Sequence, residues 1–107
     1  MVFYNKSALD DIEDIFVGLL GWHTKGNKQL RMTFEEVWNY RNDLLNIGNS
    51  LDSLSYDTVT QYEIHKRYGK YVYRHNKNQR TQWYFIYDKI GEDIFINKII
   101  NNYLTTN

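Results

Sequence analysis

The spacing of the hydrophobic residues changes near residue 54 of this 107-residue chain. Before that point, apolar side chains recur every three or four positions, as in Leu9, Ile12, Phe16 and Leu19, which is the spacing of one face of an α-helix. After it come short runs rich in tyrosine, tryptophan and β-branched residues, bounded by turn sequences such as Asn-Lys-Asn. A helical half followed by a β half predicts an α+β fold, with helices packed on an antiparallel sheet.

The beginning of the chain predicts a short strand followed by a helix. The run from Val2 to Tyr4 is brief and apolar, which suits a strand. Ser7 stands three residues before Asp10, the spacing of a helix N-cap, and Gly21 is expected to end this helix. Its acidic residues are expected on a solvated helix surface rather than in a metal site: Asp10, Asp11, Glu13 and Asp14.

A second helix is predicted after a loop over residues 21–32. Thr33 and Glu36 form a capping box that begins this helix, which is expected to end near Gly48. Its apolar stripe includes Trp38, and helical spacing favours a place in the core over a stacking platform for this ring. Two helices joined by a short loop predict an antiparallel helical hairpin.

Three strands are predicted in the second half, over residues 68–75, 82–88 and 93–100. The middle one is apolar on both faces, which is typical of a strand at the centre of a covered sheet. The predicted order is therefore β-α-α-β-β-β, with the first strand joining the sheet at an edge. No repeat, low-complexity tract or linker interrupts this order, so we expect a single domain over residues 1–107.

Composition excludes several classes of protein. The chain has no cysteine, which rules out disulfide scaffolds, zinc sites built on thiolates and cysteine nucleophiles. Its apolar runs are only a few residues long, far short of a membrane span, and its N-terminus shows no secretion signal. We therefore expect a cytoplasmic protein that uses no metal or other cofactor and does not bind a membrane.

The charge is balanced overall but unevenly distributed. Residues 1–60 carry five Lys or Arg against nine Asp or Glu, whereas residues 61–107 carry eight against four. Within 62–80, six cations are accompanied only by Glu63. This asymmetry predicts a basic surface that faces a polyanion. The alternative is a solvated hairpin whose long cations keep strand edges from aggregating.

The order of elements and three segments resemble the RelE/ParE family of toxins from bacterial toxin–antitoxin (plasmid stabilisation) systems. The segments are the opening helix pattern at 7–15, the basic, tyrosine-rich run from Arg67 to Tyr73, and the final hairpin at 83–88 and 94–100. The resemblance implies a two-helix hairpin on a small antiparallel sheet. It also implies a cognate antitoxin protein, whose extended segment wraps the toxin. The sequence leaves the oligomeric state open.

The resemblance implies one of two activities, and fold alone does not choose between them. RelE-like members are ribonucleases that cut mRNA in the ribosomal decoding site. ParE-like members poison DNA gyrase without cleaving anything themselves. The leading expectation is a metal-independent, ribosome-dependent mRNA endoribonuclease (an mRNA interferase). The alternatives are a gyrase-binding toxin and a small nucleic-acid or protein interaction module without toxicity.

Three alternating residues are candidates for the chemistry of RNA cleavage. That reaction needs a base for the 2′-hydroxyl, cations for the charge on the phosphorane and an acid for the leaving 5′-oxygen. Glu63, His65 and Arg67 would all point to one face of an extended chain, where they could supply a base and a phosphate clamp. The alternative is a solvated edge with an internal ion pair.

The resemblance adds three further candidates. By position on their strands, Arg74 and Lys98 are similar to cations that RelE-like enzymes use against phosphate, with solubility as the alternative role. Tyr103 stands where many ribonuclease members have a His or Tyr near the scissile phosphate. With an ordinary pKa of about 10, Tyr103 suits a proton donor better than a base. Packing of the C-terminal tail onto the sheet is its alternative role.

Tyrosines interleaved with cations predict a surface for single-stranded nucleic acid. Alternation puts Tyr71 and Tyr73 on one face of their strand, and Lys70 and Arg74 on the other. Neither face is purely apolar, so the sequence leaves open which one is core and whether the tyrosines simply pack between sheet and helices. The predicted nucleic-acid contacts are Lys66, Lys70, Tyr71, Tyr73 and Lys98.

Overall fold

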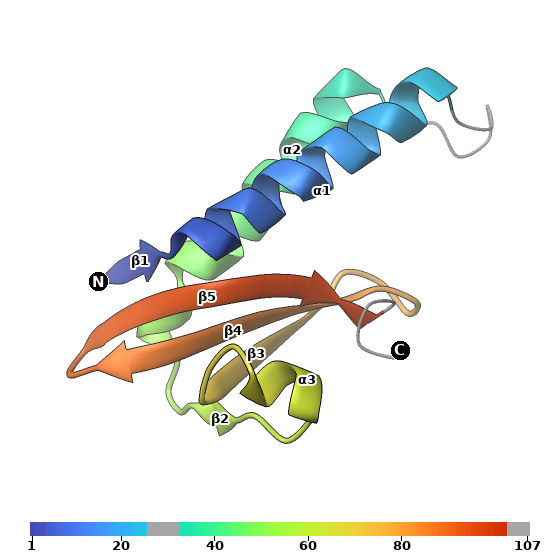
Figure 1. Ribbon diagram of the computed structural model, residues 1–107. Helices are drawn as coiled ribbons and strands as arrows, with labels where there is room; N and C mark the ends of the chain where they lie inside the picture. Colours follow the sequence, from blue (N-terminus) through green and yellow to red (C-terminus); the bar gives the residue numbers. More distant parts are fainter. Residues whose placement is uncertain (26–32, 103–107) are drawn as a thin grey trace.

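The computed structural model describes residues 1–25 and 33–102 and contains a five-stranded sheet, a helical hairpin and a short third helix (Figure 1). The predicted α+β order is confirmed. Two elements that we did not predict, β2 and α3, lie between the second helix and the first of the three predicted C-terminal strands. The elements are β1 (Val2–Tyr4), α1 (Lys6–Lys25), α2 (Phe34–Asn49), the 3₁₀ turn η1 (Leu51–Ser53), β2 (Thr58–Val59), α3 (Glu63–Lys66), β3 (Tyr71–Asn76), β4 (Gln82–Ile90) and β5 (Asp93–Asn101).

The sheet has the strand order β1-β5-β4-β3-β2. The last three strands form two antiparallel hairpins, as predicted. The first strand joins at an edge, also as predicted, and it runs parallel to β5 with Val2 opposite Ile94. That parallel pair makes the sheet mixed rather than purely antiparallel. The two edge strands, β1 and β2, are both short, which limits the unpaired backbone that each edge exposes.

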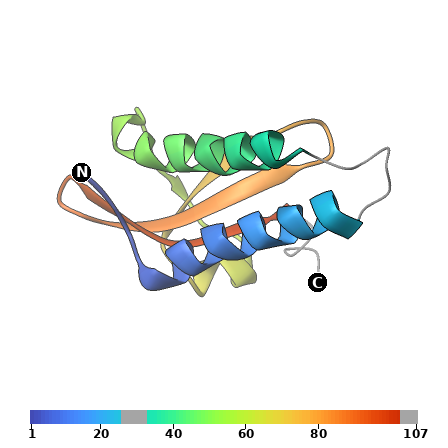
Figure 2. The same ribbon diagram turned by 90° about the horizontal axis from the view of Figure 1, so that it is seen from above.

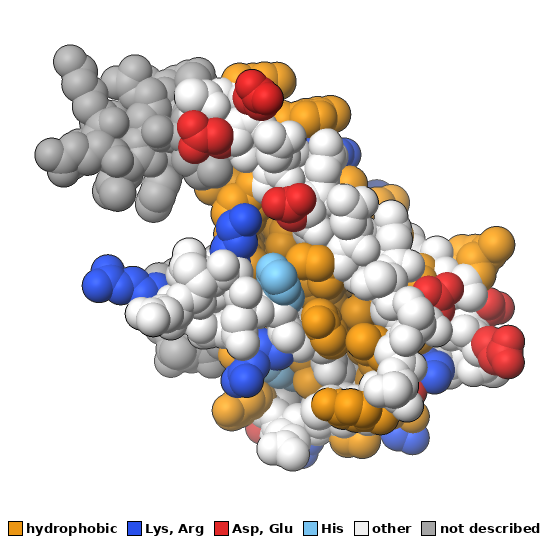
Figure 3. Space-filling model, turned by 180° about the vertical axis from the view of Figure 1, so that it is seen from behind, with side chains coloured by type: hydrophobic (Ala, Val, Ile, Leu, Met, Phe, Trp, Pro, Cys, Tyr) orange, Lys and Arg blue, Asp and Glu red, His pale blue; other side chains and the backbone are white. Residues whose placement is uncertain are grey.

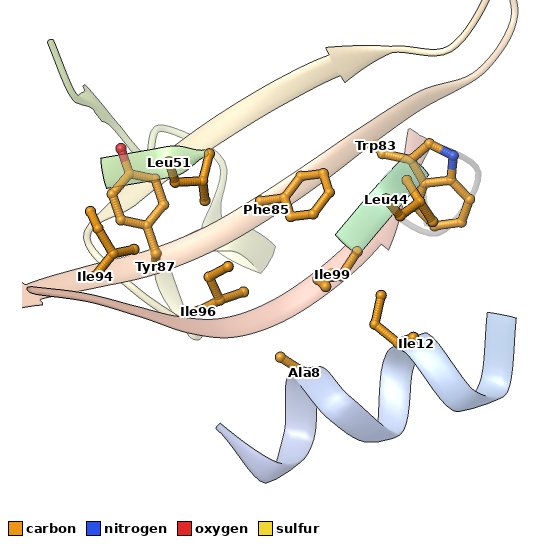
Figure 4. Close-up of a cluster of buried hydrophobic side chains, with 10 residues drawn as sticks. All are labelled: Ala8, Ile12, Leu44, Leu51, Trp83, Phe85, Tyr87, Ile94, Ile96 and Ile99. Carbon is orange, nitrogen blue, oxygen red and sulfur yellow. The ribbon is translucent and has the colours of Figure 1, made fainter. Parts of the chain in front are cut away.

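The helical hairpin covers one face of the sheet, with α1 over β5 (Figure 2). Between these layers lies the core, in which side chains from α1, α2 and η1 meet those of β4 and β5 (Figure 4). Its members are Ala8, Ile12, Leu44, Leu51, Trp83, Phe85, Tyr87, Ile94, Ile96 and Ile99. The helical pair rises away from the sheet toward the loop that joins the helices (Figure 1).

This divergence explains why the prediction for Trp38 was wrong. Its side chain is 45% exposed, so it lies outside the core. The ring packs edge-to-face on Phe16 and stacks on Phe34, with centroids 5.8 and 6.5 Å away. The Arg41 guanidinium lies 5.1 Å from the Trp38 ring. The contact with Phe16 joins the two helices, whereas Phe34 and Arg41 pack on the ring from within α2.

The boundaries of α1 differ from the prediction at both ends. The helix begins at Lys6, and the Leu9 N–H donates to the Asn5 carbonyl, so Ser7 lies inside the first turn and is not the N-cap. The helix continues through Gly21 to Lys25, because a glycine inside a helix costs only about 1 kcal/mol and does not oblige it to end. Residues 21–25 are thus helical rather than loop, and the rest of the predicted loop, 26–32, lies outside the described residues.

The start and end of α2 agree with the prediction. Thr33 is the N-cap, and its hydroxyl oxygen accepts a hydrogen bond from the Glu36 N–H at 3.1 Å. The same hydroxyl donates to the Glu36 carboxylate at 3.1 Å, which completes the contact between the two capping-box residues. The helix ends at Asn49, one residue after Gly48.

A β-bulge in β5 decides which way its side chains point. The register between β4 and β5 shifts between Ile86 and Tyr87, so that Ile86 pairs with Lys98 but Tyr87 pairs with Ile96. Strict alternation from Ile96 would have put Lys98 on the core face. The extra residue, Asn97, reverses the phase, so Ile99 enters the core and Lys98 points outward. The bulge thereby avoids burying a charge.

The opposite face of the sheet is covered by α3 and the turn that follows it. His65 lies on the ring of Tyr84 with centroids 4.8 Å apart, and Gly69 lies directly over Ile86. Ile86 points to this side and Phe85 to the helical hairpin, and neither is exposed to solvent. The prediction of a central strand apolar on both faces is confirmed.

Gly69→Ala tests how closely that turn approaches the sheet. A Cβ at this position would lie 2.9 Å from the Tyr87 carbonyl oxygen and 3.1 Å from Ile86 Cγ2. Because backbone cannot yield as a flexible side chain can, we expect a loss of about 1–3 kcal/mol in the free energy of unfolding, measured by urea denaturation. Gly18→Ala is the control: nothing lies within 4 Å of a Cβ there, and it should stabilise α1 by about 0.5–1 kcal/mol. Equal stability of the two variants would contradict this packing.

Candidate nucleic-acid interface

Glu63, His65 and Arg67 do not share one face, so this part of the predicted catalytic arrangement is wrong. The segment folds as the helix α3 instead of an extended chain, and residues two apart on a helix point in different directions. The Glu63 side chain is 87% exposed and lies 3.6 Å from Lys66 Nζ, whereas His65 is only 1% exposed. Of the two candidate bases, Glu63 thus lies in solvent and His65 in the interior of the described structure.

His65 is a structural residue of the α3 contact. Its ring packs between Tyr62, edge-to-face at 5.4 Å, and Tyr84. Neither ring nitrogen has a hydrogen-bond partner among the described residues. Burial lowers the pKa of the His65 imidazole below its ordinary value, because the charged form loses its hydration. His65 is therefore neutral at pH 7 and closed off from a large substrate.

Tyr71 and Tyr73 lie on the face that packs against the helical hairpin. Tyr71 is opposite Tyr87 and Tyr73 is opposite Phe85, and both tyrosines are half-buried against the core. Arg74 points to the other face, beside its cross-strand partner Tyr84. The question that the sequence left open is thus answered: the tyrosine face of β3 belongs to the core, and the Arg74 face carries α3.

Lys98 forms an ion pair with Asp11 instead of presenting a free charge. Lys98 Nζ donates to Asp11 Oδ1 at 2.8 Å, and the Ile99 N–H donates to Asp11 Oδ2 at 2.9 Å. The hydrogen bond to Asp11 raises the pKa of Lys98 above its ordinary value. Asp11 was expected on the solvated surface of its helix, and that prediction is wrong: its side chain is largely buried and joins α1 to the edge of β5.

Three of the described cations without a carboxylate partner lie around α3 and β3, and the other two are Arg41 on α2 and Arg80 in the turn between β3 and β4. Among the described residues, the lysines at 6, 66, 77, 89 and 98 each have a carboxylate within 4.0 Å. None lies that close to Arg67, Lys70 or Arg74 anywhere in the described ranges. Figure 3 shows acidic side chains mainly over the helices and at the β4–β5 end, and basic ones mostly over the strands. Cations without an internal partner are those available to an external anion.

A shallow groove of about 530 Å³ brings part of this charge together. Its lining is Val59, Thr60, Lys66, Arg67, Tyr68, Gly69, Lys70 and Asp88. The one carboxylate in it, Asp88, accepts hydrogen bonds from the Lys70 N–H at 2.9 Å and from Asn97 Nδ2 at 2.8 Å. Asn97 Nδ2 also donates to the Tyr68 carbonyl oxygen, at 2.7 Å. Asp88 and the bulge residue Asn97 thus hold the basic turn in a fixed position on the sheet.

A second anchor, which we did not predict, fixes the segment before α3. Asp57 accepts hydrogen bonds from the buried Tyr87 hydroxyl at 2.7 Å and from Lys89 Nζ at 2.8 Å. The hydrogen bond from Lys89 is the main cause that lowers the pKa of Asp57, and burial raises the pKa of Tyr87. No local sequence pattern indicates this contact, because it joins residues thirty positions apart.

The last candidate, Tyr103, lies outside the described residues, so the structure does not place the predicted proton donor. Of the other predicted site residues, Lys66, Arg67 and Lys70 line one groove, and Arg74 lies on the same face of the sheet. Within the described ranges, no group of three or more His, Cys, Asp or Glu side chains is arranged to hold a metal ion.

The burial of His65 predicts how stability changes with pH. Its pKa is lowered on folding, so below about pH 6.5 the unfolded chain takes up a proton that the folded chain refuses. The free energy of unfolding should therefore fall as the pH drops from 7.5 to 5.5. His65→Phe keeps a ring without unpaired nitrogens, so it should be at least as stable at pH 7.5 and lose less on acidification.

Urea unfolding at both pH values measures this effect, and His75 provides the comparison. Burial lowers the pKa of His75 as well, so part of the slope should remain in the His65 variant. His75→Phe should in turn keep the part that is due to His65. A His65→Phe variant with an unchanged slope would contradict the burial of this imidazole.

Comparison with known proteins adds no assignment to this geometry. No family model, no curated protein and no solved structure matches the chain. No helix in the part of the chain that the structure describes is long and apolar enough to cross a membrane.

Proposed function

We propose that this protein is a cytoplasmic toxin of the RelE/ParE type that binds RNA through Arg67, Lys70 and Arg74. The observation that carries the proposal is the gathering of these unpaired cations on the α3 side of the sheet. Arginine can hold a phosphate by two hydrogen bonds, and lysine contributes a point charge. The β-α-α-β-β-β order supports the toxin class, and mRNA on the ribosome is the target that this class implies. A cognate antitoxin would hold the protein inactive.

Cleavage of the bound RNA requires a base, a charge clamp and an acid. In our proposal Glu63 accepts the proton of the 2′-hydroxyl, since His65 is buried. The 2′-oxygen then attacks phosphorus while Arg67 and Arg74 stabilise the added negative charge. The bond from phosphorus to the 5′-oxygen breaks, and Tyr103 donates the proton that this oxygen takes up. The products are a 2′,3′-cyclic phosphate and a free 5′-hydroxyl.

A second function is favoured by the separation of the two candidate bases. Because Glu63 is in solvent and paired with Lys66 while His65 is buried, the described residues offer no pre-assembled acid–base pair. A toxin that acts by binding alone needs no such pair. DNA gyrase is the target that the ParE-like branch of the resemblance implies.

The triple variant Arg67→Ala, Lys70→Ala, Arg74→Ala tests the proposed contact surface. For a single-stranded RNA, each lost phosphate contact should lower the slope of log K against log salt by about 0.7, so the triple variant should lose about 2. Affinity at low salt should fall at the same time. Fluorescence anisotropy with a labelled RNA over a range of salt concentrations measures both.

Lys6→Ala is the matched control, because Lys6 is an exposed lysine on α1 that pairs with Asp10. It removes one charge far along the chain from the proposed surface and should leave the slope unchanged. An unchanged slope in the triple variant would exclude this surface as the RNA contact.

Brief expression of the chain in bacteria, with mapping of mRNA ends and of DNA double-strand breaks, separates the two activities. A ribonuclease should produce new mRNA ends that depend on translation, and Tyr103→Phe should slow cleavage without weakening ribosome binding, since only the proton donor is lost. A gyrase poison should instead produce DNA breaks that Tyr103→Phe does not reduce. Breaks without mRNA cleavage would overturn the ribonuclease proposal. The absence of both breaks and mRNA cleavage would overturn the toxin class.

A further inference from the structure

Three tyrosines between residues 56 and 68 point away from the core. Tyr56 is 76% exposed and Tyr62 is 65% exposed, and Tyr68 is exposed to a smaller extent. Exposing a large aromatic side chain leaves apolar area in water, which folding alone does not favour. The tyrosines that we predicted as nucleic-acid contacts, Tyr71 and Tyr73, are half-buried instead. Exposed aromatic area on this side of the sheet therefore comes from the segment before β3.

Two of the three exposed tyrosines line a depression that also contains an unpaired cation. Tyr56 and Arg74 line one hollow of about 300 Å³, at the edge of β3. Tyr68 lines the groove that also contains Arg67 and Lys70. The hollow includes Thr58 and the groove includes Val59, so the short edge strand β2 borders both depressions.

Tyr62 lies between these depressions in the chain, and α3 fixes its position. The Lys66 N–H donates to the Tyr62 carbonyl oxygen at 2.9 Å, which places the two side chains four residues apart on one side of the helix. The buried ring of His65 packs edge-to-face on Tyr62 at 5.4 Å. Because His65 is itself wedged against Tyr84, the Tyr62 ring is oriented by the interior although it is largely in solvent. An oriented exposed ring loses little entropy on stacking with a ligand.

Exposed rings together with unpaired cations match the chemistry of an unstacked nucleic-acid strand. The rings offer faces on which bases stack, and the cations reach the phosphates between them. A base-paired duplex hides its base faces, and so it could use the cations but not the rings. An acidic peptide would likewise use only the cations. The combination therefore favours single-stranded RNA over either alternative.

We propose that a strip along β2 and α3, the β2–α3 strip, binds unpaired bases of single-stranded RNA. The strip consists of Tyr56, Tyr62, Tyr68, Arg67, Lys70 and Arg74. Tyr56 and Tyr62 supply the outer stacking platforms, and the three cations hold the backbone that joins the stacked bases. This inference specifies that the surface contacts the bases of the RNA, and it therefore rests on the RNA binding of the proposed function.

The test measures binding of a fluorescein-labelled single-stranded RNA of twelve uridines and of a fully paired RNA duplex, by anisotropy. The wild-type protein should bind the single strand more tightly at equal salt. Tyr56→Leu and Tyr62→Leu keep an apolar side chain but remove the ring, so each should weaken single-strand binding about tenfold. Their salt slope should stay the same, because no phosphate contact is lost. Tyr62→Phe keeps the ring and should bind as the wild type does.

Phe34→Leu is the matched control: Phe34 is similarly exposed but lies on α2 beside two glutamates. It should not change RNA binding. RNA binding that depends on Arg67, Lys70 and Arg74 but is unchanged in both tyrosine-to-leucine variants would overturn the strip and leave the proposed function standing. Absence of RNA binding by the wild-type protein would overturn both proposals.

Discussion

The rest of this structure depends on the burial of β4 from both sides. Phe85 and Tyr87 require the helical hairpin on one face, and Ile86 requires a cover on the other. No long helix is left in the described chain to supply that second cover. The segment from η1 to β3 supplies it with a single helical turn and a glycine that lies directly on the strand. The need to bury both faces of β4 thus determines where the following cations, Arg67 and Lys70, lie.

Polar contacts then fix the positions of segments that hydrophobic burial brings close to the sheet. Asp11 joins α1 to the edge of β5 beyond the end of β1, where the Ile99 N–H has no neighbouring strand. Asp88 and Asn97 hold the turn after α3, and Asp57 holds the segment before it. Each of these groups satisfies a backbone donor or acceptor, or a buried hydroxyl, that would otherwise lose its hydrogen bond to water. The carboxylates near the sheet are therefore occupied, which leaves the arginines on its outer face without internal partners.

The sequence predicted the parts of the fold that local patterns specify. The Thr33–Glu36 capping box and the three C-terminal strands with their two hairpins are visible in short windows of residues. The errors have a common physical origin, because they concern choices made by distant contacts. Trp38 is exposed because the hairpin leaves the sheet, and α3 is helical because the covered face of β4 needs a compact turn there. Glu63 and Lys66, an ion pair one helical turn apart, were the available signal for that helix. The bulge at Asn97 could have been inferred from a lysine that alternation alone would have buried.

The parallel pairing of β1 with β5 links the two ends of the described chain, since Val2 lies opposite Ile94. Contacts between residues so far apart in sequence require closure of a very long loop, and they form late in folding. During synthesis, the two helices leave the ribosome before any of the last three strands exists. Neither the core beneath them nor the cover of β4 can be completed until β5 has emerged, so the basic face is assembled only after β5 has been made. For a protein proposed to act on the translation machinery, this order of assembly means that a partly synthesised chain has not yet formed the surface that would interfere with translation.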